Sequence, residues 1–210
     1  MSFSERERGR IRNILGFFVK ESNKDILLVA LFKRLFFLDR LSFLETGITR
    51  TNYTYSAKPN GPVPKFLENE LKGIDQSTNP EIVGVDMVVK LKKPASKKAE
   101  YEESYFALTD RNWEIDQKIF TPYELRLLKK IAERCKDKTG AELIEESHRC
   151  FSWINAFQSG KGNGKILNFR DEIGSEDDPY NEEERESLDL SIQETKLLLS
   201  GVENVRPEWS

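Results

Sequence analysis

The 210-residue chain has only two cysteines and one histidine, and it lacks a long uninterrupted hydrophobic run. Two cysteines do not make a disulfide framework, so we expect a reducing compartment. An excess of basic charge is also missing, because the formal net charge is −3, which gives no general attraction to nucleic acid or to a membrane. The first residues are charged from the fifth position and lack an apolar segment. We therefore expect no secretory signal and a cytoplasmic location.

The most hydrophobic stretch, residues 26–44, is interrupted by polar side chains, among them Lys33 and Arg34. A membrane-spanning helix needs about 20 predominantly apolar residues, and charges near its middle are costly. We therefore interpret this stretch as the central helix of a globular core and expect no membrane partner. Thirteen Phe, three Trp and six Tyr supply enough bulk for one packed core.

Apolar residues at helical spacing predict a mainly α fold, in which a compact helical domain surrounds this central hydrophobic helix. An amphipathic helix is predicted over residues 4–20. The central helix is expected to start after a cap at Asn23 and to stop at Gly47, where a left-handed conformation is easiest for glycine. A short helix is expected to open at Pro62 or Pro64, since proline is tolerated in a first helical turn.

An inserted β-hairpin is predicted at about 80–110, because β-branched residues at 82–91 and aromatic residues at 101–108 flank a polar tip. Two capping boxes follow the hairpin, at 121–124 and 139–142. Each combines a threonine with a glutamate three residues later, so two further helices are predicted.

The expected domain organisation places the helical domain at 1–158. A flexible acidic linker is expected at 159–180, a C-terminal helix at 181–201 and a tail at 202–210. The linker begins with a glycine-rich segment, and seven acidic residues with one arginine follow between 176 and 186. Acidic residues in the first turn suit the positive end of a helix dipole.

Candidate chemical sites are few. Cys135, His148 and Cys150 lack the paired spacing and the fourth ligand of a structural zinc site, so buried cysteines and a hydrogen-bonded histidine are favoured. The segment 160–165 lacks the spacing of a P-loop and is interpreted as a flexible loop. Asp39 has no second carboxylate at a helical offset, which favours an ion-paired structural role over a buried catalytic acid. We expect no enzymatic activity, no catalytic residue, no cofactor and no bound metal.

Lysines concentrate at the tip of the predicted hairpin. Lys92, Lys93, Lys97 and Lys98 are candidates for contact with a phosphate backbone, and tyrosines follow close by in sequence. An exposed tip whose charge keeps it soluble and protects a sheet edge is the favoured interpretation. A nucleic-acid-binding regulator that uses this tip is therefore the second functional hypothesis.

An ordered set of short motifs adds a resemblance. Asp39 follows an aromatic and a leucine, Thr46-Gly47 ends the central helix, Gly61-Pro62-Val63 enters a short helix, and His148 precedes Trp153. In this order the motifs resemble the Panacea, or SocA-like, antitoxin domain over residues 8–157. An aromatic residue often precedes Gly-Pro-Val in that family, whereas this chain has Pro59-Asn60.

The resemblance implies a mostly α-helical protein with a small β-element. It also implies an antitoxin of a toxin–antitoxin pair, a class also found in prophage and defence settings, which neutralises its toxin by direct protein contact. The partner would be a cognate protein toxin encoded by a neighbouring gene, and a homodimer is an open alternative. The motif residues are interpreted as scaffold, with partner contacts on the surrounding surface. They are Asp39, Gly47, Gly61, Pro62, Val63, His148 and Trp153.

Overall fold

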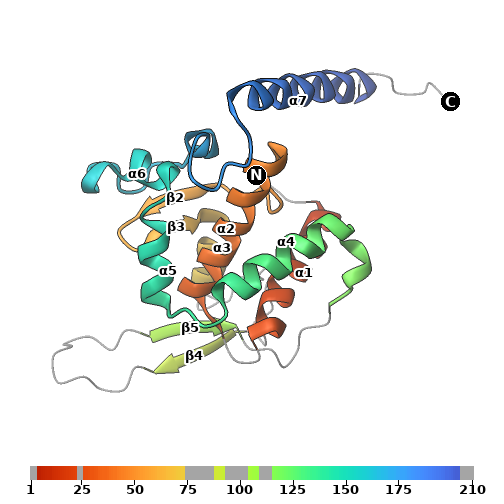
Figure 1. Ribbon diagram of the computed structural model, residues 1–210. Coiled ribbons are helices and arrows are strands. Elements are labelled where there is room, and N and C mark those ends of the chain that lie inside the picture. Colours follow the sequence, from red (N-terminus) through yellow and green to blue (C-terminus); the bar gives the residue numbers. More distant parts are fainter. Residues whose placement is uncertain (1–3, 23–25, 74–87, 93–103, 109–114, 204–210) are drawn as a thin grey trace.

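The computed structural model describes residues 4–22, 26–73, 88–92, 104–108 and 115–203. Within these residues the fold is mainly α, as predicted, with two small antiparallel sheets (Figure 1). The α-helices are α1 (Glu5–Ser22), α2 (Leu28–Thr46), α3 (Lys65–Gly73), α4 (Pro122–Cys135), α5 (Gly140–Ser147), α6 (Phe151–Phe157) and α7 (Glu182–Glu203). The strands are β1 (Ile26–Leu27), β2 (Tyr55–Lys58), β3 (Gly61–Pro64), β4 (Val88–Lys92) and β5 (Ser104–Leu108).

Helix α2 is the centre of the core, as the hydrophobic stretch predicts. Its residues from Leu31 to Ser42 are all buried, because α1, α4, α5 and β3 pack around it (Figure 1). The helix ends as expected: Gly47 has a φ of 68° and donates its N–H to the Phe43 carbonyl at 2.7 Å.

The start of α2 differs from the prediction. Ile26 and Leu27 form strand β1, which pairs with Leu108 and Ala107 of β5, and the helix begins only at Leu28. The partner strand is about eighty residues away in sequence, so this pairing overrides the local helical pattern. The predicted cap, Asn23, lies outside the described residues.

The inserted hairpin is present as β4 and β5, which pair antiparallel from Val88↔Leu108 to Lys92↔Ser104. Strand β1 joins β5, so the sheet order is β1-β5-β4. Lys92 is the last residue of β4, and Lys93, Lys97 and Lys98 lie outside the described residues.

A second hairpin, of β2 and β3, occupies the stretch that the sequence indicates only as an extended segment and a turn. Tyr55 pairs with Pro64, and Lys58 pairs with Gly61 across a two-residue connection. Proline is tolerated in β3 because β3 is an edge strand. The other edge of β2 bonds to the segment 164–167, where the Ala57 N–H donates to the Lys165 carbonyl at 2.8 Å and the Leu167 N–H donates to the Tyr55 carbonyl at 2.9 Å. The short helix α3 then begins at Lys65. The hairpin packs against α2, α5 and α6, so its strands are mostly buried, whereas its connection, Pro59-Asn60, is exposed.

Both predicted capping boxes are present. In α4, Thr121 Oγ1 accepts from the Glu124 N–H, while the Glu124 carboxylate accepts from the Thr121 N–H. In α5, Thr139 and Glu142 form the same reciprocal pair. These two short-range patterns fix where α4 and α5 begin.

The segment expected to be a flexible linker is packed onto the core in its middle part. Leu167 is buried, Phe169 lies against the rings of Phe36 and Tyr55, and Glu172 has no exposed surface. The 3₁₀ helix η5 (Phe169–Glu172) therefore belongs to the core.

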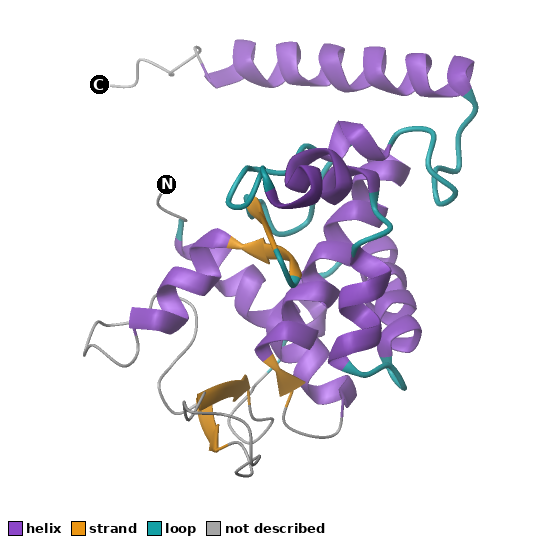
Figure 2. Cartoon of the chain, turned by 90° about the vertical axis from the view of Figure 1, so that its left-hand side faces the viewer, coloured by secondary structure: helices purple, strands orange, loops and turns teal. Residues whose placement is uncertain are grey.

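Helix α7 extends across one end of the molecule, and both views show its far half away from the body (Figures 1 and 2). Its near half is attached to the end of α2. Arg185 donates to the Leu44 carbonyl at 2.8 Å, and Ile192 lies directly over Gly47. Asn181 caps the first turn by accepting from the Glu184 N–H.

Candidate functional site

The Gly-Pro-Val motif forms strand β3, where backbone and buried polar side chains approach closely. Gly61 has a φ of +86°, a conformation that L-residues rarely adopt. A Cβ at this position would collide with Ser147 Oγ and would stand 2.9 Å from Lys33 Nζ. Glycine is therefore required here by both its conformation and the space available.

Lys33 projects from α2 toward this strand and is the residue that sequence reasoning missed. It is only 1% exposed, and its Nζ donates to the Pro62 carbonyl at 2.9 Å. No carboxylate forms an ion pair with it among the described residues. Burial lowers the pKa of Lys33 from 10.5 to about 7, since a low-dielectric environment disfavours the charged form. The only signal in the sequence was a lysine inside the most apolar stretch of the chain.

His148 and Trp153 stack face to face at the corner between α5 and α6. Their ring centroids are 3.9 Å apart, and Phe157 stacks on the other side of Trp153 at 4.5 Å. The Trp153 indole N–H donates to the Lys58 carbonyl at 3.1 Å, which ties the corner to the β2–β3 hairpin. Burial first, and the nearby Lys33 charge second, lower the pKa of His148, so a neutral ring is favoured.

Asp39 lies on α2 but is separate from this group. Its carboxylate accepts from the Arg50 and Thr51 N–H groups at 2.6 and 2.9 Å, from the Thr51 hydroxyl, and from the Tyr55 hydroxyl at 2.8 Å. Burial raises the pKa of Asp39, and these four donors act against that rise. The predicted structural role thus uses backbone and hydroxyl donors rather than the expected ion pair, and the carboxylate is fully buried.

The described part of the chain contains no assembled metal site, and its two thiols are poor nucleophiles. No group of three or more histidine, cysteine or acidic side chains there is placed to hold a metal ion. Burial raises the pKa of the Cys135 thiol to about 11 and that of the Cys150 thiol to about 12, which disfavours thiolate at neutral pH.

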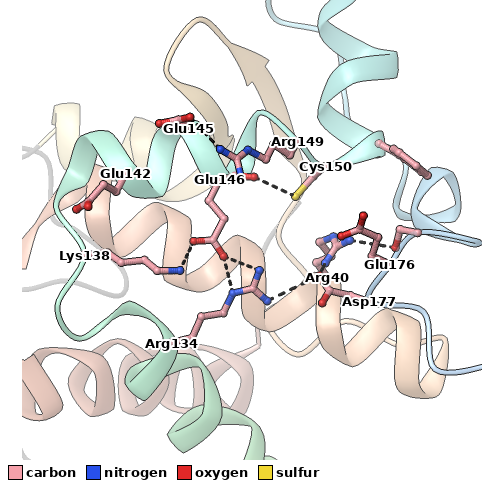
Figure 3. Close-up of a pocket in the computed structure, with 12 residues that line it drawn as sticks. Arg40, Arg134, Lys138, Glu142, Glu145, Glu146, Arg149, Cys150, Glu176 and Asp177 are labelled. Atoms are coloured by element: carbon pink, nitrogen blue, oxygen red, sulfur yellow. Dashed lines mark hydrogen bonds and ion pairs between the residues drawn. The ribbon is translucent and has the colours of Figure 1, made fainter.

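A cleft opens on the other side of the α5–α6 corner (Figure 3). Its volume is about 650 Å³, and its walls come from α2, α4, the α5–α6 corner and the loop before α7. The lining residues are Arg40, Arg134, Lys138, Glu142, Glu145, Glu146, Arg149, Cys150, Phe151, Ser175, Glu176 and Asp177.

The floor of the cleft is a network of paired charges. Arg134 and Lys138 both bind the Glu146 carboxylate, with an Arg134–Glu146 distance of 2.5 Å. Arg40 donates to the buried Glu172 at 2.7 Å and to Asp177 of the loop. These contacts attach the loop to the core and leave the floor without free charge.

The stretch of chain that contains these elements matches a known protein family. The model of the family described as "Antitoxin SocA-like, Panacea domain" matches residues 31–154, which is more than half of the chain. The chain belongs to this family. No curated protein and no solved structure matches it.

The Panacea match covers α2 to α6 almost completely. Every motif residue from Asp39 to Trp153 lies inside it, as does the buried Lys33. Helix α1, the segment 155–181 and helix α7 lie outside. None of the described helices combines the length and the apolar character that crossing a membrane requires.

Proposed function

We propose that this chain is an antitoxin that neutralises a cognate protein toxin by direct contact, without catalysis of its own. The observation that carries the proposal is the Panacea match over residues 31–154, which covers nearly all of the α2–α6 scaffold. The toxin is expected to be encoded by a neighbouring gene, in a toxin–antitoxin, prophage or defence setting. Both proteins are expected to act in the cytoplasm.

The environment of the motif residues supports a scaffold role. Asp39 is fully buried and accepts four hydrogen bonds, and Lys33 is buried against a backbone carbonyl. Groups held in this way are not presented to a substrate. Exposed side chains around the scaffold would then make the contact with a partner. A protein inhibitor binds in this way, whereas an enzyme presents reactive groups to its substrate.

The test is to express each neighbouring reading frame alone in the source organism, and then together with this chain. We expect one frame to arrest growth and co-expression to restore it. Purified toxin and antitoxin should elute as one stable complex in size-exclusion chromatography. If no neighbouring frame arrests growth, the antitoxin assignment fails; if growth recovers without a complex, neutralisation by contact is wrong.

Stoichiometry separates binding from catalysis. When a fixed amount of toxin is titrated with this chain, a contact inhibitor should reach full inhibition near one equivalent or a small whole-number ratio. Complete inactivation by a small fraction of an equivalent would instead show turnover and would overturn the non-catalytic part of the proposal.

A further inference from the structure

The rim of the cleft has a net charge, whereas the charges on its floor are paired. The floor cations are each engaged by Glu146, Glu172 or Asp177. Around the opening stand three exposed carboxylates, Glu142, Glu145 and Glu176, and one exposed guanidinium, which binds Glu145 at 2.9 Å. The rim is therefore net negative, and a cationic group entering the cleft would be attracted rather than repelled.

An apolar contact is available at the same opening. Phe151 begins α6 at the edge of the cleft with 44% of its surface exposed, and Ile154 is 45% exposed three residues later. Residues three apart on a helix are neighbours, so the two side chains form one exposed apolar pair. Exposed aromatic side chains beside a concave surface are common anchors of protein interfaces.

One wall of the cleft comes from outside the matched domain. Ser175, Glu176 and Asp177 follow the last matched residue by more than twenty positions, whereas the remaining lining residues lie within 31–154. The cleft thus combines the family scaffold with a segment outside the family match, and Asp177 attaches that segment to Arg40 and Arg134.

We propose that this cleft is the docking site for a basic segment of the protein toxin, an inference that rests on the function proposed above. A lysine or arginine of the toxin lies at Glu176, and an adjacent apolar side chain covers Phe151. Phosphate-bearing ligands are disfavoured by the negative rim. Exposed ion pairs are worth little individually, so burial of the aromatic side chain supplies much of the binding energy and the acids supply selectivity.

The probe for a direct test is a heptapeptide in which lysine alternates with leucine, added to the full-length ¹⁵N-labelled chain. We expect saturable shift changes at the amides of residues 145–151 and 175–177, and weaker binding at higher salt. The same peptide with glutamate in place of lysine should bind at least about tenfold more weakly. Equal binding of the two peptides, or changes confined to other parts of the chain, would overturn the proposal.

Two surface variants and one control locate the contact. Glu176→Lys and Phe151→Ala should each weaken the lysine peptide by about fivefold or more, while Glu21→Lys, which makes the same charge change on α1, should not. All three positions are exposed, and unchanged thermal melting shows that each variant is folded. An equal loss in the control would mean that net charge, not the cleft, determines binding.

The toxin assay separates this proposal from the broader function. If Glu176→Lys and Phe151→Ala lose toxin binding while Glu21→Lys keeps it, both proposals are supported. If all three variants still bind and neutralise the toxin like the parent, the cleft assignment is wrong although the antitoxin function stands. If the parent itself neutralises no neighbouring toxin, the function fails irrespective of the peptide result.

Discussion

Replacement of the buried Lys33 by methionine should stabilise the protein at neutral pH. The unfolded chain binds a proton at this lysine up to about pH 10.5, whereas the folded chain releases it near pH 7. At about 1.4 kcal/mol per tenfold change, holding Lys33 in the core costs about 4 kcal/mol at pH 7. Methionine has a similar length and no charge, so Lys33→Met removes this cost.

The hydrogen bond to Pro62 offsets part of the gain. Lys33 Nζ donates to that carbonyl at 2.9 Å, and an unsatisfied buried carbonyl costs about 1–3 kcal/mol. We therefore expect Lys33→Met to raise the free energy of unfolding by about 1–3 kcal/mol at pH 7. Urea denaturation followed by far-UV circular dichroism measures this difference.

The pH dependence gives the sharper test. Between pH 7 and 10.5 the unfolded chain binds more protons than the folded chain, so the free energy of unfolding rises with pH in this interval. The parent should gain about 1.5 kcal/mol from pH 7 to 8.5, whereas Lys33→Met should stay nearly constant. His148, whose pKa is lowered, contributes a rise mainly below pH 7. The two thiols, whose pKa values are raised, contribute a fall mainly from pH 9 upward.

The matched control is Lys129→Met, which replaces an exposed lysine on α4. This variant should follow the parent at every pH. If Lys33→Met and the parent show parallel pH profiles, or if Lys33→Met is less stable than the parent at pH 7, then Lys33 is not a buried destabilising cation and the reasoning is refuted.

Three further changes test the scaffold by urea denaturation. Gly61→Ala should cost about 2–5 kcal/mol, because the positive φ is strained for alanine and the new Cβ also meets Ser147, whereas Gly164→Ala, at a similar φ with open space, should cost only the backbone part, about 1–2 kcal/mol; equal costs would exclude the steric explanation. Asp39→Asn should cost about 2–4 kcal/mol, because an amide cannot accept all four hydrogen bonds; a neutral result would contradict this. Thr121→Ala should cost about 1 kcal/mol through loss of the cap, and a stability equal to the parent's would show the cap to be dispensable.

What the sequence predicted correctly depends on short-range chemistry. The capping boxes at Thr121 and Thr139 each involve residues three positions apart, and the stop at Gly47 depends on one backbone conformation. The predicted start of the central helix was wrong because it depends on a long-range contact. Ile26 and Leu27 pair with a strand about eighty positions away, and no short window of sequence around Ile26 contains that information.

The chemistry of the site was less predictable, because it depends on long-range packing. Lys33 looks like one of several interruptions in an apolar run until β3 places a carbonyl against it. The cleft requires Arg40 on α2 and Asp177 in a late loop to meet, 137 positions apart. The ordered motif could be recognised in the sequence, but the sequence did not show which of the motif residues lie close together in the fold.

The α5–α6 corner connects the buried motif to the cleft, because its side chains point to both sides. Ser147, His148 and Trp153 face the β2–β3 hairpin, while Glu146 and Phe151 line the cleft. A backbone shift that relieves the crowding introduced by Gly61→Ala would therefore move the cleft wall as well. The packing of the motif and the geometry of the proposed docking site are coupled through the short stretch from Glu146 to Trp153. The tightly packed motif, against which Lys33 is buried, holds the corner, and the corner holds Glu146 and Phe151 at the proposed docking site.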